Sequence, residues 1–140
     1  MTTITAPASD KKLLRAGLWT VQIMLALGFG MAGFPKTFSP MEELVQAIPS
    51  LAGSPEALVR FIGISELLGA IGLVLPALTR IQPRLTPLAA AGLALVMVLA
   101  ALFHLVRGEL SAMPINLVLG ALAAFVVWGR LEAAPIAPRI

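Results

Sequence analysis

The sequence contains no cysteine, and this absence excludes several kinds of chemistry. Without a thiol, the chain itself can form no disulfide, supply no thiolate ligand to a metal and carry out no dithiol exchange. Histidine occurs once, at His104. One histidine without a second histidine or a cysteine is a poor zinc site, so we expect no bound metal.

Charge is also scarce, because only 12% of the residues are charged whereas 59% are hydrophobic. Soluble proteins average about a quarter charged residues, and a chain of 140 residues has too little interior to hide so much apolar surface from water. We therefore predict a membrane protein. The basic residues bracket apolar runs instead of forming a patch with interleaved aromatics, so nucleic acid is not an expected partner.

Four long apolar segments predict an all-α, integral membrane bundle of four helices. The first uncharged run, Ala16 to Pro35, is about 30 Å long as a helix, which is one hydrocarbon thickness. A signal peptide is the alternative for this run, and its length favours a spanning helix. The helices are expected at about 13–36, 56–78, 85–107 and 113–130.

A short amphipathic helix is predicted between the first two spans, at about 40–48. The stretch Ser39-Pro40-Met41-Glu42 has the residue types of a helix start, with Ser39 as N-cap. Ser54-Pro55-Glu56 repeats this signature before the second span. We expect the short helix to lie at the membrane interface over the mouth of the bundle. A capped loop helix with no lid role fits the pattern equally well.

Short connections predict an up-down-up-down topology and a single membrane domain over residues 1–140, with residues 1–10 as a frayed tail. The basic residues near the helix ends divide unequally between the two sides. On the side of the termini lie Lys11, Lys12, Arg15, Arg80, Arg84, Arg130 and Arg139, against Lys36, Arg60 and Arg107 on the other. The positive-inside rule then predicts an inner-membrane protein with both termini in the cytoplasm.

One carboxylate interrupts the second span. Glu66 has Gly63, Gly69 and Ala70 beside it at helical spacing, so it lies on a face that another helix can approach closely. A charge at hydrocarbon depth costs about 3 kcal/mol and persists mainly where it has a partner or a task. Two interpretations stay open for Glu66: a buried ion pair with Arg60 or Lys36, or a functional group.

Each span places at least one polar side chain in the same outer half of the bundle, beside small residues that mark packing faces. We therefore predict that these side chains converge on one pocket. Gln22 lies on the same face of its helix as Lys36 but deeper in the membrane, so we expect it to line the floor of the pocket. For single members, snorkelling to headgroups or an interhelical hydrogen bond is the alternative. The candidate ligand-binding residues are Gln22, Lys36, Arg60, Glu66, His104 and Asn116.

The same residues carry a family resemblance. The carriers are Gly33-Phe34-Pro35-Lys36, the pattern E-x-x-G-x-x-G-L-x-x-P from Glu66 to Pro76, the run from Leu85 to His104 with Glu109 nearby, and Asn116 through Arg130. Over about residues 14–130 the chain resembles the DoxX-like family of small four-helix membrane proteins. The resemblance implies a four-helix bundle and an association with redox chemistry, as subunits of thiosulfate and quinone oxidoreductases or as membrane partners of thiol-redox proteins. Another similar branch acts as a membrane chaperone.

Three functions compete. We predict a redox-associated accessory protein whose pocket binds a quinone-like molecule, with Glu66 and His104 exchanging protons or hydrogen-bonding its head group. The alternatives are a scaffold or assembly chaperone and, third, a small-solute transporter, which would need to dimerise because no inverted repeat is visible. No self-contained catalytic motif is present, so an enzymatic role would be that of an oxidoreductase subunit. The expected partners are the bilayer, a redox protein and a second copy of the chain.

Overall fold

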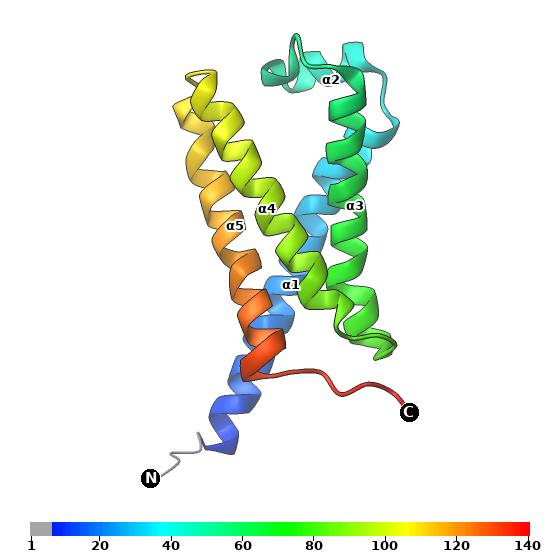
Figure 1. Cartoon of the computed structure of the whole chain (residues 1–140), viewed down its shortest axis with the longest axis vertical. Helices are drawn as coiled ribbons and strands as arrows, with labels where there is room; N and C mark the ends of the chain where they lie inside the picture. Colours follow the sequence, from blue (N-terminus) through cyan, green and yellow to red (C-terminus); the bar gives the residue numbers. More distant parts are fainter. Residues whose placement is uncertain (1–6) are drawn as a thin grey trace.

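The computed structural model describes residues 7–140, and all regular structure in that range is helical (Figure 1). Four helices are long and apolar enough to cross a membrane. This confirms the predicted all-α membrane bundle with a short helix between the first two spans. The helices are α1 (Ala8–Phe38), α2 (Met41–Ala47), α3 (Glu56–Thr79), α4 (Leu85–Val106) and α5 (Met113–Trp128).

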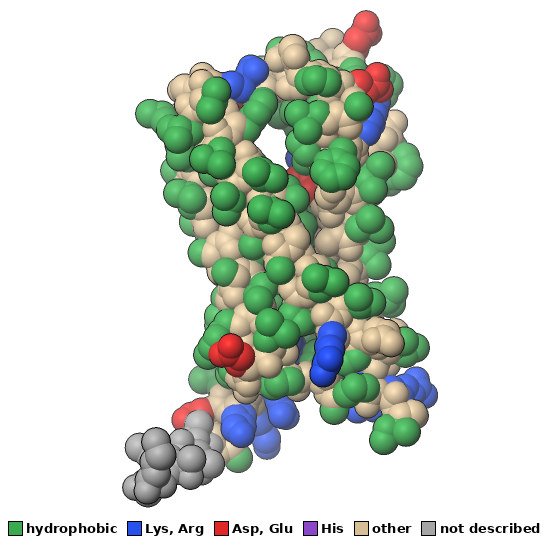
Figure 2. Space-filling model, viewed as in Figure 1, with side chains coloured by type: hydrophobic (Ala, Val, Ile, Leu, Met, Phe, Trp, Pro, Cys, Tyr) green, Lys and Arg blue, Asp and Glu red, His purple; other side chains and the backbone are tan. Residues whose placement is uncertain are grey.

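The long helices form two pairs, because α1 packs mainly against α3 and α4 packs mainly against α5. The pairs lie close together at the end that carries both termini and diverge toward the end that carries α2 (Figure 1). We call these the terminal end and the α2 end. Basic side chains gather at the terminal end in the space-filling view (Figure 2).

The core lies where the two pairs meet. Its largest members are buried aliphatic and aromatic side chains from α1, α3 and α4, among them Leu25, Phe29, Leu73, Leu93 and Met97. The outward faces remain apolar, so a membrane would cover them with lipid instead of water. The sequence pattern is apolar on every side because both the core and the surroundings are apolar.

Two predicted helix caps are wrong. α1 continues to Phe38, and the Ser39 N–H donates to the Pro35 carbonyl at 2.8 Å, so Ser39 ends α1 instead of capping α2. Pro40 and Pro55 are the N-cap residues of α2 and α3, and neither helix has a side-chain cap. The hydroxyl of Ser54, expected to cap α3, has no hydrogen-bond partner in the described part of the chain.

The ends of the chain also differ from the expected pattern. α1 begins at Ala8, so the last residues of the expected tail are helical, and residues 1–6 lie outside the described range. At the other end, α5 continues into a π-helical turn, Gly129–Ala133. The Ala-Pro segment after it contains no helix, as its prolines predict.

Candidate functional site

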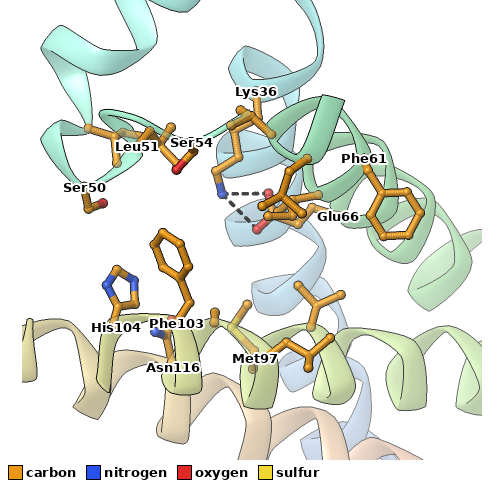
Figure 3. A pocket seen from close by; sticks show the side chains of 17 residues that line it. Lys36, Ser50, Leu51, Ser54, Phe61, Glu66, Met97, Phe103, His104 and Asn116 are labelled. Atoms are coloured by element: carbon orange, nitrogen blue, oxygen red, sulfur yellow. Dashed lines mark hydrogen bonds and ion pairs between the residues drawn. The ribbon is translucent and has the colours of Figure 1, made fainter. Parts of the chain in front are cut away.

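Glu66 is held in a buried ion pair with Lys36. The Lys36 ammonium donates to both carboxylate oxygens at 2.9 Å (Figure 3). Glu66 is 3% exposed, and the Lys36 side chain is 16% exposed. Of the two partners that the sequence leaves open, the structure selects Lys36, which lies in the last turn of α1 opposite the middle of α3.

Two glycines bring α1 and α3 close enough for this pair to form. A Cβ added at Gly33 would lie 2.8 Å from the Gly63 carbonyl oxygen, and one added at Gly63 would lie 2.7 Å from the Lys36 Cβ. Neither position therefore has room for a methyl group. Gly63, one of the small residues that predict a close helix contact beside Glu66, is thus one of the two glycines that produce it.

Arg60 does not reach the candidate pocket. Its Nη1 donates to the carbonyl oxygens of Lys36 at 3.0 Å and Ser39 at 2.6 Å, and its remaining nitrogens bind Glu56 one turn earlier. The last carbonyls of a helix lack partners within the helix. Arg60 supplies donors to the end of α1, which is why its side chain turns away from the cavity.

His104 is oriented by an acidic residue in the following turn. Its Nδ1 lies 2.7 Å from Glu109 Oε2, and the other Glu109 oxygen accepts from Arg107 Nε at 2.9 Å. Gly108, with a φ of +71°, provides the left-handed turn that returns Glu109 toward the imidazole. Because a carboxylate only accepts, Nδ1 carries the proton of this bond, and Nε2 is the ring nitrogen left for another partner.

The pKa of Glu109 is held below its usual value of 4.5, mainly by the hydrogen bond from Arg107 and then by the one from His104. A lowered folded-state pKa stabilises the fold above pH 4.5, and this contribution is lost as the pH falls through the folded pKa. We expect the thermal midpoint of the wild-type protein to fall more steeply below pH 4.5 than that of Glu109→Gln. Exposed Glu43→Gln should retain the wild-type profile. If the thermal midpoints of the wild type and Glu109→Gln fell equally steeply below pH 4.5, this would contradict the lowered pKa of Glu109.

A cavity of about 320 Å³ opens at the α2 end. Figure 2 shows it as a hollow between the two helix pairs, and Figure 3 shows its walls. The Lys36–Glu66 pair lies on the wall formed by α1 and α3, whereas Phe103, His104 and Asn116 lie on the wall formed by α4 and α5. Most other lining residues are apolar, namely Ile48, Leu51, Leu58, Val59, Phe61, Ile62, Val96, Met97, Leu99 and Ala100.

Two buried polar atoms in the cavity wall lack hydrogen-bond partners within residues 7–140. These are Asn116 Nδ2 and Ser54 Oγ, and both atoms are buried. Asn116 is 9% exposed and lies in the first turn of α5. A buried polar group without a partner is costly, so these two atoms mark positions where a polar ligand atom or water would be stabilised.

Four of the six sequence-predicted residues line this cavity, namely Lys36, Glu66, His104 and Asn116. Gln22 does not form its floor. Its amide nitrogen donates to the Leu73 carbonyl at 2.6 Å, and its oxygen accepts from Arg130 Nε at 2.6 Å in a separate buried cluster. Fourteen residues of helix separate Gln22 from Lys36 by about 21 Å, which is too deep for a shared pocket.

Sequence reasoning missed the contribution of the segment after α2. The residues that close the cavity at this end are Ile48, Ser50, Leu51 and Ser54, around the 3₁₀ turn Pro49–Leu51, whereas no residue of α2 itself lines it. Ser54 gave a signal, because a polar hydroxyl beside a predicted bundle mouth is a candidate ligand-binding group. Its assignment as a helix cap concealed this signal.

The comparisons with known proteins add one match. The model of a family described as the DoxX-like family matches residues 20–126. No curated protein and no solved structure matches the chain. The matched range includes the four cavity residues predicted from the sequence and ends before Arg130.

Proposed function

Because this chain belongs to the DoxX-like family of membrane proteins, we propose that it is a redox-associated accessory protein that binds a small lipophilic molecule of the quinone class. The proposed site is the cavity at the α2 end. The observation that carries the proposal is the unpartnered amide of Asn116, which lies with His104 in an otherwise apolar cavity wall. A mainly apolar cavity with a few converging polar groups is the usual form of a small-molecule site.

The size and opening of the cavity support this class of ligand. A volume of about 320 Å³ is at the lower end of ligand pockets, which span roughly 300–1,000 Å³. This space suits one aromatic ring with its substituents. The hollow opens on the side of the bundle between α3 and α4 (Figure 2), where a hydrocarbon tail would extend into lipid.

The charges around the cavity favour a neutral head group. Lys36 is already neutralised by Glu66, and Arg60 points elsewhere. Both oxygens of Glu66 accept from Lys36, so the proposed donors to the head group are Asn116 and Ser54, and Nε2 of the neutral His104 ring is the proposed acceptor for a hydroxyl of the reduced head group. The carbonyl oxygens of a quinone accept hydrogen bonds, which matches the donors of Asn116 and Ser54. Electrons would come from a partner protein.

The distribution of basic residues supports an orientation for this site. Seven of the ten lysines and arginines belong to the terminal end, and we propose that this end faces the cytoplasm of a cell membrane. The cavity would then lie in the outer half of the bilayer. A redox partner would reach it from that side or through the lipid.

The proposal predicts saturable binding of a short-chain ubiquinone to the purified protein in maltoside detergent, measured by isothermal titration calorimetry. Asn116→Ala should weaken binding of this ubiquinone, and His104→Ala binding of its reduced ubiquinol form, each by about fivefold, because each removes roughly one hydrogen bond of about 1 kcal/mol. Ala100→Phe should block binding by filling the cavity while every polar group is retained. Ser65→Ala is the matched control, because Ser65 is not among the residues that line the cavity and its hydroxyl donates to the Phe61 carbonyl.

The outcome separates this function from a scaffold. A scaffold would show no saturable ubiquinone binding, and the three cavity variants would change only the stability of the fold. Equal affinities in Ala100→Phe and the wild type would reject the cavity as the site.

A further inference from the structure

Arg130 is buried at the terminal end, in the π-helical turn after α5, and is 5% exposed. Its Nε donates to Gln22 at 2.6 Å, and its Nη1 donates to the Ala134 carbonyl at 3.3 Å. The guanidinium lies 5.4 Å from the centre of the Trp19 ring. Its Nη2 has no partner in the described range. One strong donor of a buried cation is therefore left unused.

The positive charge of Arg130 also lacks a counter-charge. The ion pairs formed by residues 7–140 involve Glu56, Glu66 and Glu109, and none includes Arg130. Arg15 adds a second positive charge within electrostatic reach. A buried charge is stable when it is paired and hydrogen-bonded, so this environment calls for an anion from outside the chain.

A pocket of about 470 Å³ lies beside this guanidinium. Arg84 and Pro83 line it from the α3–α4 turn, and the remaining wall is Leu131 and the C-terminal segment 135–138. The Arg139 N–H donates to the Arg80 carbonyl at 2.8 Å and so holds the segment across the terminal end. Figure 1 shows this segment running from α5 toward the α3–α4 turn. Arg84 and Arg130 thus both line this pocket.

We propose that this pocket binds the phosphate of an anionic phospholipid headgroup or of a soluble phosphate, through the guanidinium groups of Arg130 and Arg84. Guanidinium groups match the oxygens of a phosphate in geometry and charge. The pocket lies at the end of a membrane span, at the level where headgroups are found. The site is separate from the cavity at the α2 end and does not depend on the function proposed for that cavity.

The test is native mass spectrometry of the full chain, purified in maltoside detergent and titrated with phosphatidylglycerol, with diacylglycerol of the same acyl chains, or with inorganic phosphate. We expect phosphatidylglycerol to remain bound and diacylglycerol to be lost. Binding of phosphatidylglycerol without inorganic phosphate assigns the site to lipid, whereas binding of both assigns it to any phosphate source. Equal retention of phosphatidylglycerol and diacylglycerol would overturn the proposal.

Three substitutions test whether phosphatidylglycerol binds at this pocket. Arg84→Gln removes an exposed side chain and should reduce phosphatidylglycerol affinity about fivefold, the effect of roughly one basic residue near an anionic surface. Arg130→Gln should reduce it at least as much, with circular dichroism to confirm the fold. Lys12→Gln removes the same charge at the same end, outside the pocket, and should change the affinity less than twofold. Equal losses for Lys12→Gln and Arg84→Gln would show that the binding is not at this pocket.

Discussion

Replacing Lys36 with methionine should lower the free energy of unfolding by about 3–5 kcal/mol, the usual cost of removing one partner from a buried ion pair. The substitution leaves the Glu66 carboxylate, 3% exposed, without the ammonium that donates to both of its oxygens. An ionised side chain at hydrocarbon depth is costly without its partner. The measurement is denaturant unfolding in detergent micelles, followed by far-ultraviolet circular dichroism.

The double variant Lys36→Met, Glu66→Leu provides the decisive comparison. Removing both charges leaves no unpaired ion, so we expect most of the lost stability to return. Lys12→Met is the matched control, because Lys12 is exposed at the other end of α1. A Lys36→Met loss as small as that of Lys12→Met would show that the pair does not stabilise the fold. A double variant less stable than the single variant would show that Glu66 has a further partner.

Replacing Gly63 with alanine should destabilise the protein by about 1–3 kcal/mol, as overpacking of a close contact usually does. The new methyl carbon would lie 2.7 Å from the Lys36 Cβ and 2.8 Å from two backbone atoms, the Lys36 carbonyl carbon and the Thr37 nitrogen. Rotating a side chain cannot relieve contacts with backbone atoms, so α1 and α3 must separate. The separation would also weaken the Lys36–Glu66 pair.

Gly28→Ala is the matched control for this substitution. Gly28 lies on α1, and nothing lies within 4 Å of a Cβ added there. Because alanine has the higher helix propensity, this variant should be neutral or more stable by up to about 1 kcal/mol. Equal effects of Gly28→Ala and Gly63→Ala in the same unfolding assay would contradict the close contact between α1 and α3.

The Lys36–Glu66 pair therefore has a structural consequence for the proposed ligand site. It fixes one wall of the cavity at the α2 end, where the two helix pairs diverge. The opposite wall, with His104 and Asn116, is positioned independently by α4, α5 and the turn that carries Glu109. A ligand that contacts both walls would connect the two pairs at the end where they are farthest apart.

The sequence by itself determined the number and nature of the spans. A run of apolar residues as long as the hydrocarbon layer leaves a helix as the only way to satisfy every backbone group. The sequence also determined how deep each side chain lies in the membrane, because position along a helix follows residue number at about 1.5 Å per residue. This is why Lys36, Glu66, His104 and Asn116 were predicted to lie in one half of the bundle, and all four line the cavity at the α2 end.

The tertiary structure alone decided which of these groups are partners. The sequence leaves both Lys36 and Arg60 as possible partners of Glu66. Contacts at Gly33 and Gly63 set the rotation of α1 against α3. This rotation brings Lys36 to Glu66, whereas Arg60 turns to the end of α1. Gln22 lies on the stripe predicted for the cavity, yet it pairs with Arg130, 108 residues away. Because the helices of this chain are apolar on every face, the hydrophobic pattern does not give the angle by which each helix is rotated about its own axis. That angle follows from how the side chains of neighbouring helices interlock.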